Sequence, residues 1–452
     1  MSRVVDRNPL TSNQIQTIKN SLKFTPNVFD VFGGQESLPI NFYIDDGNRF
    51  ILPYLFSSVF FKIRNNNVYP KIEINFLKTL RENQNFVHLE ALSQLDKFGT
   101  TTLGLYTGFG KTVLGAKLTS DKKLLTVILI HRDILIKQWT KTFNDFTDAK
   151  IWIVDSKHPI PQEFNVIICM SQRWKFIPET IRNKVGMLIV DEAHCFCVPS
   201  AVDCLLAFQP KYVVVQSATL ERDDGMHNMI YSIVGTHGVF REIDKPFHLI
   251  KWETGIVPER KMNRRGKTDW ANMTKQILYS PERNKMAIAW TQKLKQRTIL
   301  VLTSQQEHVH YLYNELLAKG ESVDYMCGTK RAYNNCRILV GTVPKIGTGF
   351  DQETFCDDFD GKRFDTLIML CSYRKYNVFV QCFGRIFRSE EPLIIQFIDS
   401  DSIYEGHWRI EKAWAIKRGG KIHILSAKGK KVDEDKKLDN WAKNKMKQLQ
   451  GK

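Results

Sequence analysis

Two short segments of the chain carry residue types suited to phosphate chemistry. In the first, glycines let the backbone turn its N–H groups toward an anion, a lysine can reach the outer phosphates, and a hydroxyl can hold Mg²⁺. This segment reads Thr107, Gly108, Phe109, Gly110, Lys111 and Thr112. Its composition and spacing predict a nucleotide phosphate-binding loop.

The second segment follows an apolar run some eighty residues later. It contains Asp191 and Glu192 and ends at His194. At the end of a buried strand, one carboxylate can hold a metal ion and the other can orient a water molecule. The order and separation of the two segments predict nucleotide hydrolysis with ATP and Mg²⁺, in which Thr112 and Asp191 hold the metal.

The first segment departs from the strict phosphate-loop pattern at one position. The pattern requires glycine five positions before Gly110, where this chain has Leu105. The flanks still fit, because residues 102–106 predict a strand entering the loop and residues 113–118 predict a helix leaving it. The N-terminus of that helix would then point at the anion.

The composition is that of a folded protein with a basic surface. Among 452 residues, 43% are hydrophobic and 25% charged, and the formal net charge is +17. That length predicts two to three domains. The positive charge favours a polyanionic partner such as nucleic acid, although charge alone does not separate DNA from RNA.

The spacing of the cysteines and the hydropathy of the chain indicate its cellular compartment. None of the nine cysteines is spaced like a zinc-binding CxxC pair, and they form no compact disulfide framework. The N-terminus lacks the apolar core of a secretory signal, and the apolar runs are too short to span a bilayer. We therefore expect a soluble intracellular protein in the cytoplasm, nucleus or virion, without a membrane partner.

Short runs rich in Val and Ile alternate with amphipathic stretches along most of the chain. Such runs are typical of buried parallel strands in an α/β sheet. Four follow the phosphate loop and four form a later set: 124–130, 166–169, 187–190, 212–215, 298–302, 337–340, 366–371 and 393–398. The polar residues 245–280 between the sets predict a linker. We therefore expect two α/β lobes with a cleft between them.

The ends of the chain differ from this pattern. Residues 40–54 predict a hairpin with a polar turn at Asp45–Asn48, and residues 75–95 predict a helix. The tail from Ala427 to Lys452 has nine lysines and four acidic residues. A solvated tail and a nucleic-acid contact are both consistent with that composition.

A basic motif stands out in the second lobe. Gln381, Arg385 and Arg388 form a QxxGRxxR pattern. The two arginines are three residues apart, so on a helix they would share a face. They could act together on a phosphate, or form a surface ion-pair cluster.

With these segments, the chain resembles the superfamily-two DExH (DEAH-box) helicases, in particular those of large DNA viruses, a group that includes the poxvirus transcript-release helicase. The resemblance covers roughly residues 80–415 and rests on motifs in the family's order. Besides the segments above, these include Leu80–Gln84, Val127–Trp139, Asn165–Gln172, Gln216–Thr219, Thr298–Ser304 and Leu339–Asp351.

The resemblance implies two tandem RecA-like parallel-sheet lobes with an ATP cleft and a small N-terminal α+β extension. It implies the following domain boundaries: an N-terminal accessory region at 1–95, an ATP-binding domain at 96–244, a linker at 245–280, a C-terminal helicase domain at 281–425 and a basic tail at 426–452.

The resemblance also implies roles for individual residues. Gln84 would read adenine, Gly349 and Asp351 would border the nucleotide, and Arg385 and Arg388, with Gln381, would assist hydrolysis as arginine fingers. The residues implied to couple hydrolysis to movement are His194, Ser217 and Thr219. Those implied to contact nucleic acid are His131, Arg132, Ser171, Gln172, Thr303, Ser304 and Thr342.

We therefore predict an ATP-dependent helicase or translocase acting on nucleic acid, DNA rather than RNA, in viral transcription, replication or repair. Three alternatives remain open at this point. They are a translocase that releases transcripts without unwinding, a basic nucleic-acid-binding protein with a decayed ATPase, and a phosphate-loop kinase.

Overall fold

The chain folds into two compact units, Met1–Glu242 and Ile243–Lys452. The computed structural model describes residues 1–27, 38–61, 67–218, 220–222, 224–243, 245–263, 266, 268–347 and 350–427. The predicted basic tail, apart from its first two residues, lies outside this range. No helix among the described residues combines the length and apolar character that crossing a bilayer requires.

Unit 1 is built on a seven-stranded sheet in which the described strands all pair in parallel. Across the sheet the strands are β12 (Val239–Arg241), β6 (Thr100–Leu105), β11 (Tyr212–Gln216), β10 (Met187–Asp191), β7 (Thr126–Ile130), β9 (Val166–Met170) and β8 (Ile151–Ile153). Parallel strands need crossover connections, and helices supply most of them.

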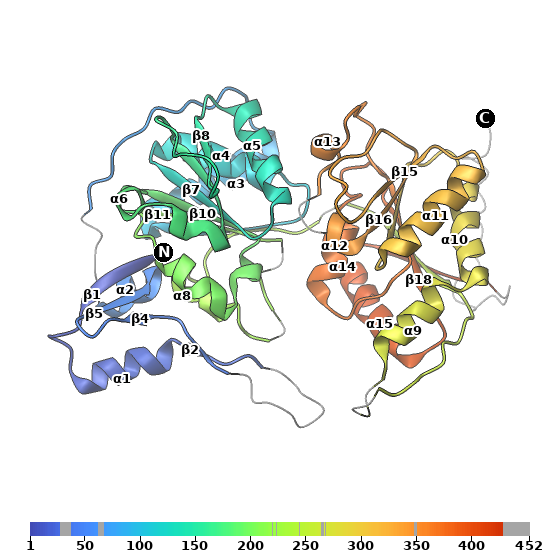
Figure 1. The fold of residues 1–452 in the computed structure, drawn as a ribbon, viewed down its shortest axis with the longest axis horizontal. Helices are drawn as coiled ribbons and strands as arrows, with labels where there is room; N and C mark the ends of the chain where they lie inside the picture. The colour runs from blue at the N-terminus through green and yellow to red at the C-terminus, as the bar shows by residue number, and fades with distance from the viewer. Residues whose placement is uncertain are drawn as a thin grey trace. The chain divides into compact units, whose positions relative to one another are not determined.

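Each face of this sheet is covered, which explains why its strands are apolar throughout. Along β7, Ile128 and Ile130 join the core beneath α3 (Glu82–Phe98), α4 (Lys111–Lys122) and α5 (Ile134–Phe146). Val127 and Leu129 join the core on the other face, with α7 (Val202–Leu206) and α8 (Asn228–Val234). Figure 1 shows α8 on the side of the sheet away from α3, α4 and α5. Short helical segments η1 (Ser171–Phe176), α6 (Glu179–Arg182), η2 (Ala193–Phe196) and η3 (Pro199–Ala201) complete the connections.

The N-terminal region packs on the α7 and α8 side of unit 1. It contains β1 (Ser2–Asp6), α1 (Ser12–Ser21), β2 (Lys23–Phe24), β3 (Ile40–Asn41), β4 (Ile44–Asp45), β5 (Arg49–Pro53) and α2 (Tyr54–Phe61). The predicted hairpin is present as β4 and β5, with Ile44 opposite Ile51. It is shorter than predicted because β3 pairs with β2 instead. Met1, Phe42 and Tyr54 belong to the same core as α8, so this region is part of the unit.

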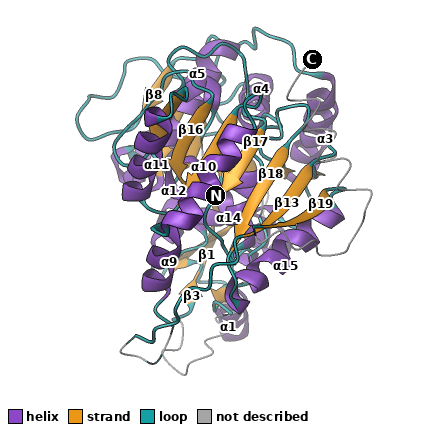
Figure 2. Ribbon diagram, turned by 90° about the vertical axis from the view of Figure 1, so that its right-hand side faces the viewer, coloured by secondary structure: helices purple, strands orange, loops and turns teal. Residues whose placement is uncertain are grey.

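Unit 2 has a second seven-stranded parallel sheet, β15 (Val323–Met326), β16 (Ile338–Thr342), β14 (Ile299–Thr303), β17 (Thr366–Met369), β18 (Leu393–Ile398), β13 (His248–Glu253) and β19 (Lys421–Ser426). Figure 2 shows β17, β18, β13 and β19 side by side. The helices are α9 (Trp270–Leu278), α10 (Pro281–Lys293), α11 (Gln306–Ala318), α12 (Val343–Ile346), α13 (Gln352–Phe355), α14 (Tyr376–Phe383) and α15 (Ser402–Lys417).

The predicted linker is one place where structure and prediction differ. Residues 245–280 contain strand β13 and helix α9, and β13 lies between β18 and β19 within the sheet. The sequence does not indicate a strand inside the sheet here, because Lys251 interrupts the apolar pattern. That lysine is buried, and its ammonium group pairs with Glu253 at 2.8 Å and Glu405 at 2.7 Å. The strand is therefore buried despite its charge.

A buried carboxyl group lies on α15 without a hydrogen-bond partner. Glu411 is fully buried, and neither of its carboxyl oxygens has a partner. Burial raises the pKa of Glu411 well above its ordinary value. The group therefore stays protonated in the folded protein at pH values where an exposed glutamate is ionised.

We predict that Glu411→Gln changes how stability depends on pH. Because the folded-state pKa is raised, the native carboxyl contributes stability below about pH 4, the ordinary glutamate range, and this contribution is lost as pH rises through the raised value. Glutamine does not titrate, so the variant should gain about 1–3 kcal/mol over the native protein near pH 8 and little near pH 4. Thermal unfolding across this pH range measures the difference.

The exposed Glu282→Gln on α10 is the control, and its unfolding curves should follow those of the native protein. Parallel pH profiles for Glu411→Gln and the native protein would contradict the prediction.

Candidate nucleotide and nucleic-acid site

The predicted phosphate loop lies between β6 and α4. Gly108 and Gly110 both have positive φ angles, +92° and +103°, which favour glycine. A Cβ on Gly110 would also lie 2.3 Å from Nε2 of Gln84. The loop therefore turns its backbone at the N-terminus of a 12-residue helix, an arrangement suited to binding an anion.

The missing glycine of the strict pattern has a structural explanation. Leu105 is the last residue of β6 and is fully buried in the core beneath α4. Its carbonyl accepts a hydrogen bond from Nζ of Lys111 at 3.0 Å. The position is thus part of the strand, and the loop is formed by the residues that follow.

Gln84 forms a hydrogen bond with the phosphate loop. Its side chain is buried, and Nε2 donates to the carbonyl of Phe109 at 3.0 Å, which the guanidinium of Arg81 also contacts. Oε1 of Gln84 accepts from the backbone N–H of Arg81 at 3.1 Å. The residue predicted to read adenine therefore contacts the phosphate loop directly. Arg81 had no predicted role.

The two carboxylates lie at the end of β10, beside β11. Asp191 is opposite Gln216, whose Nε2 donates to the carbonyl of Lys111 at 3.1 Å. Burial, and then the charge of Glu192, raise the pKa of Asp191, although a hydrogen bond from Trp139 and the charge of Lys111 oppose the shift. A nearby cation would therefore stabilise the ionised form of the Asp191 carboxyl group.

Glu192 has an unusual backbone conformation. Its φ is +51°, and among the described residues only Lys123 shares a positive φ without being glycine. Such a conformation costs about 1–3 kcal/mol and is concentrated at functional sites. It places a carboxylate oxygen of Glu192 3.5 Å from Nδ1 of His194.

Two of the predicted coupling residues lie beside this carboxylate. Nδ1 of His194 lies 3.0 Å from Oγ of Ser217, which follows the end of β11. Burial, together with the charges of Arg222, Lys111 and Arg132, lowers the pKa of His194 to about 4. The imidazole is therefore neutral near pH 7. Thr219 lies outside the described residues.

The residues predicted to contact nucleic acid differ in their exposure. Gln172 is exposed at the start of η1, and Ser171 is partly exposed. Both ring nitrogens of His131 are buried without hydrogen-bond partners, and burial lowers its pKa to about 4. The charge of Arg132 adds to that shift. His131 directly follows β7, which pairs with β10, so it lies at the same sheet edge as the carboxylates.

In unit 2 the predicted contacts are less accessible. The hydroxyl of Thr303 is buried and lies 2.7 Å from Nδ1 of His308. Thr342 is also buried, and the hydroxyl of Ser304 is buried without a partner. The Thr303 hydroxyl therefore contacts His308 in the interior of the unit. The strand-end motif alone does not indicate this contact.

The two arginines of the QxxGRxxR motif converge on one loop of unit 2. Arg385 donates to the carbonyls of Gly347 and Phe350, both at 2.5 Å. Arg388 forms an ion pair with Asp351. Burial opposes ionisation of that carboxyl, but the charges of Arg388 and Arg363 outweigh it and lower the pKa of Asp351.

The prediction that the two arginines share a face of a helix was wrong. Helix α14, which carries the buried Gln381, ends at Phe383, and Arg385 and Arg388 lie in the turns beyond it. Gly384 follows the helix, and glycine disfavours continuing it. The turns after α14 therefore bring both arginines to residues 347–351. Gly349 lies outside the described residues.

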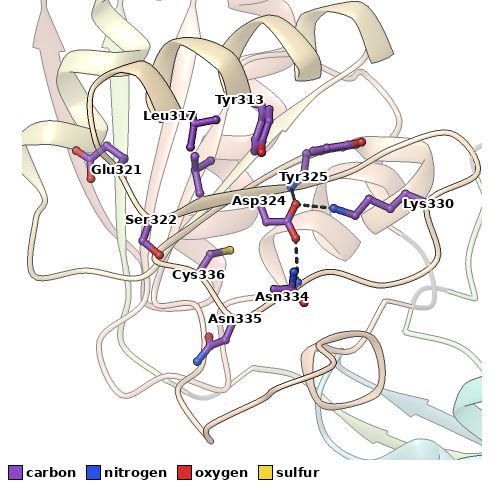
Figure 3. Close-up of a pocket in the computed structure, with 11 residues that line it drawn as sticks. Tyr313, Leu317, Glu321, Ser322, Asp324, Tyr325, Lys330, Asn334, Asn335 and Cys336 are labelled. Carbon is purple, nitrogen blue, oxygen red and sulfur yellow. Dashed lines mark hydrogen bonds and ion pairs between the residues drawn. The ribbon is translucent and has the colours of Figure 1, made fainter.

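A separate pocket in unit 2 contains none of the predicted site residues. It has a volume of about 460 Å³ and lies beside edge strand β15 (Figure 3). Its acidic groups are already paired, because Asp324 accepts from Lys330 and from the backbone N–H of Asn334, and Glu321 pairs with Arg337. The pocket therefore offers no free charge to a ligand.

These features define a class of protein. A glycine loop at a helix N-terminus, carboxylates at the end of another strand of the same sheet and two parallel sheets are the elements of a phosphate-loop protein with tandem RecA-like lobes.

Comparison with known proteins identifies the family. Residues 76–222 match the model described as "Type III restriction enzyme, res subunit". The protein 161L of Invertebrate iridescent virus 6, which is named as a helicase, is 26% identical over 78% of this chain and 84% of its own length. The DNA 3'-5' translocase XPB2 of Sulfurisphaera tokodaii is 33% identical over 29% of each chain.

A solved structure agrees in fold. Yeast (S. cerevisiae) Dbp5, bound to RNA and ADP BeF3, superposes with a TM-score of 0.53 at 12% identity, covering 81% of this chain and 93% of its own. The chain is a superfamily-two helicase related to those of large DNA viruses, and hence a nucleic-acid-dependent ATPase with helicase or translocase activity.

Two residues near the carboxylates had no predicted role. Gln138 and Trp139 of α5 donate to Thr112 at 3.2 Å and to Asp191 at 2.9 Å. Both residues end the Val127–Trp139 motif, for which the resemblance implies only nucleic-acid contact. No local pattern indicates that a helix side chain will face a strand end 52 residues further along the chain.

We predict that Glu192→Gln lowers ATP turnover by about 10²–10⁴-fold, the usual effect of removing a general base. Glutamine keeps the size and left-handed backbone of the native residue but cannot accept a proton from water. ATP binding should persist, so a binding assay and phosphate release together measure the effect.

The exposed Glu179→Gln on α6 in the same unit is the matched control, and its turnover should equal that of the native protein. Native-like turnover in Glu192→Gln would show that another group orients the water.

Proposed function

We propose that this edge of the unit 1 sheet binds ATP·Mg²⁺ and hydrolyses ATP. The observation that carries the proposal is a set of hydrogen bonds that joins the phosphate loop to the carboxylate strand. Gln216 contacts the Lys111 carbonyl, and Gln138 and Trp139 contact Thr112 and Asp191. Separate segments thus meet at the place where phosphate and metal ligands are needed.

In this proposal the residues have distinct tasks. Lys111 neutralises the outer phosphates, and Thr112 and Asp191 hold Mg²⁺. The bound Mg²⁺ supplies positive charge that stabilises the phosphate oxygens during transfer. Glu192 orients the attacking water, and Nδ1 of the neutral His194 lies 3.5 Å from Glu192 and 3.0 Å from Oγ of Ser217, just past the end of the adjacent strand. That proximity favours Ser217 as the relay by which the hydrolytic state reaches the rest of the protein.

We further propose that the second unit contributes charge to hydrolysis. Arg385 and Arg388 are held on the loop that includes Gly347 and Asp351. An arginine supplied to the transition state increases phosphoryl transfer by about 10³–10⁵-fold. Dependence on both units would couple hydrolysis to movement along a strand.

We predict that Arg385→Ala reduces hydrolysis by about 10³-fold and leaves ATP affinity unchanged. The loss has two parts, because the substitution removes a positive charge and frees the Gly347 and Phe350 carbonyls. Phosphate release and equilibrium ATP binding separate the two quantities.

The exposed Arg374→Ala, just before α14, provides the control for lost surface charge. Equal effects from both substitutions would mean that general charge, and not Arg385, supports hydrolysis.

We propose that the strand is DNA. The support is the local similarity to a DNA translocase and the broader similarity to proteins of DNA viruses. The positive charge of the chain suits either nucleic acid.

The test is the ATPase rate with single-stranded DNA, duplex DNA and RNA at several stated salt concentrations. We expect single-stranded DNA to stimulate hydrolysis most, with an effect that weakens as salt rises because phosphate contacts release counterions. Stronger stimulation by RNA would overturn the DNA assignment. An unwinding assay on a tailed duplex then separates a helicase from a translocase that does not part strands.

A further inference from the structure

Helix α5 directs two consecutive polar side chains at the proposed metal site. Nε2 of Gln138 donates to Oγ1 of Thr112 at 3.2 Å. Nε1 of Trp139 donates to Oδ2 of Asp191 at 2.9 Å. Thr112 and Asp191 belong to different motifs, so α5 is the element that contacts both.

The indole of Trp139 has little freedom to move. The residue is fully buried, and its ring stacks on Phe143 with centroids 5.9 Å apart and an interplanar angle of 28°. The ring also packs against Gly115 of α4, where an added Cβ would lie 2.7 Å from it. A buried indole N–H requires an acceptor, and the Asp191 carboxylate supplies it. The ring therefore sets the orientation of the carboxylate.

The hydrogen bonds leave the oxygen atoms able to bind a cation. Oδ1 of Asp191 accepts from the backbone N–H of Glu192 at 3.0 Å, and Oδ2 accepts from Trp139. Each carboxylate oxygen has two lone pairs, so one remains on each. The Thr112 hydroxyl likewise keeps one lone pair after accepting from Gln138. Oxygen ligands of this kind are those that Mg²⁺ prefers, so the residues present fit the ion.

We propose that Gln138 and Trp139 are positioning residues that hold the Thr112 hydroxyl and the Asp191 carboxylate in the orientation required by Mg²⁺. The inference rests on the proposed ATP·Mg²⁺ site and extends it to residues that do not touch the substrate. Losing either donor frees a metal ligand to rotate, which weakens metal binding while the phosphate loop and its lysine stay intact. Outer partners of metal ligands typically contribute 10–100-fold to metal affinity or activity.

The test compares full-length native protein with Trp139→Phe and, separately, Gln138→Leu. Phenylalanine keeps an aromatic ring but removes the donor, and leucine is close to glutamine in size. Binding of a fluorescent ATP analogue is measured with Mg²⁺ and with EDTA, and ATP hydrolysis is measured over a Mg²⁺ titration. We expect both variants to need about 10–100-fold more Mg²⁺ for half-maximal hydrolysis. Binding in EDTA should match that of the native protein.

Phe143→Leu is the matched control, because it loosens the packing of the Trp139 ring and keeps the indole donor. A normal Mg²⁺ requirement in Phe143→Leu, beside a raised one in Trp139→Phe, supports the proposal. If Phe143→Leu and Trp139→Phe lower the melting temperature by the same amount and show the same Mg²⁺ requirement, packing explains the effect and the proposal is overturned. A native Mg²⁺ requirement in Trp139→Phe also overturns it. Native protein that neither binds nor hydrolyses ATP would instead refute the proposed function.

Discussion

The buried carboxylate of Asp191 is the group on which the organisation of unit 1 depends. A carboxylate removed from water must be hydrogen-bonded or meet a positive charge, or it becomes protonated. Here the partners are the N–H of Glu192, the indole of Trp139 and the charge of Lys111, drawn from three segments of the chain. They can meet because parallel strands end at a common edge of the sheet. The same edge carries His131 and Ser217.

Much of the fold could be predicted because parallel strands covered on both faces are apolar along their whole length. The eight predicted runs correspond to β7, β9, β10, β11, β14, β16, β17 and β18. The strands that escaped prediction are short, polar or at an edge. β8 has three residues, and β13 contains the ion-paired Lys251. An ion pair formed with a residue 154 positions away cannot be read from a local pattern.

The candidate site was predictable where chemistry requires particular residues at fixed spacing. The glycines of the phosphate loop and the carboxylate pair are of this kind. Interactions between distant segments were not predictable, and these include the contact of Gln84 with the loop and the donors on α5. The spacing of Arg385 and Arg388 suggested a shared helix face, but their positions depend on the turns after Gly384 and on contacts with residues more than thirty positions earlier.

The position of β13 has a consequence for the order in which the chain can fold during synthesis. β13 is the first strand of unit 2 to emerge, yet its neighbours are β18 and β19, the last two strands made. Until Leu393–Ile398 has been translated, the strand has both edges unpaired, and such edges are templates for association with other chains. In unit 1 the first strand of the seven-stranded sheet, β6, likewise pairs with the last two strands made, β11 and β12, but that sheet is complete at Arg241, before β13 is made. The nascent protein therefore passes through a stage with a finished first unit and an open second sheet, when protection by a chaperone would have its greatest effect.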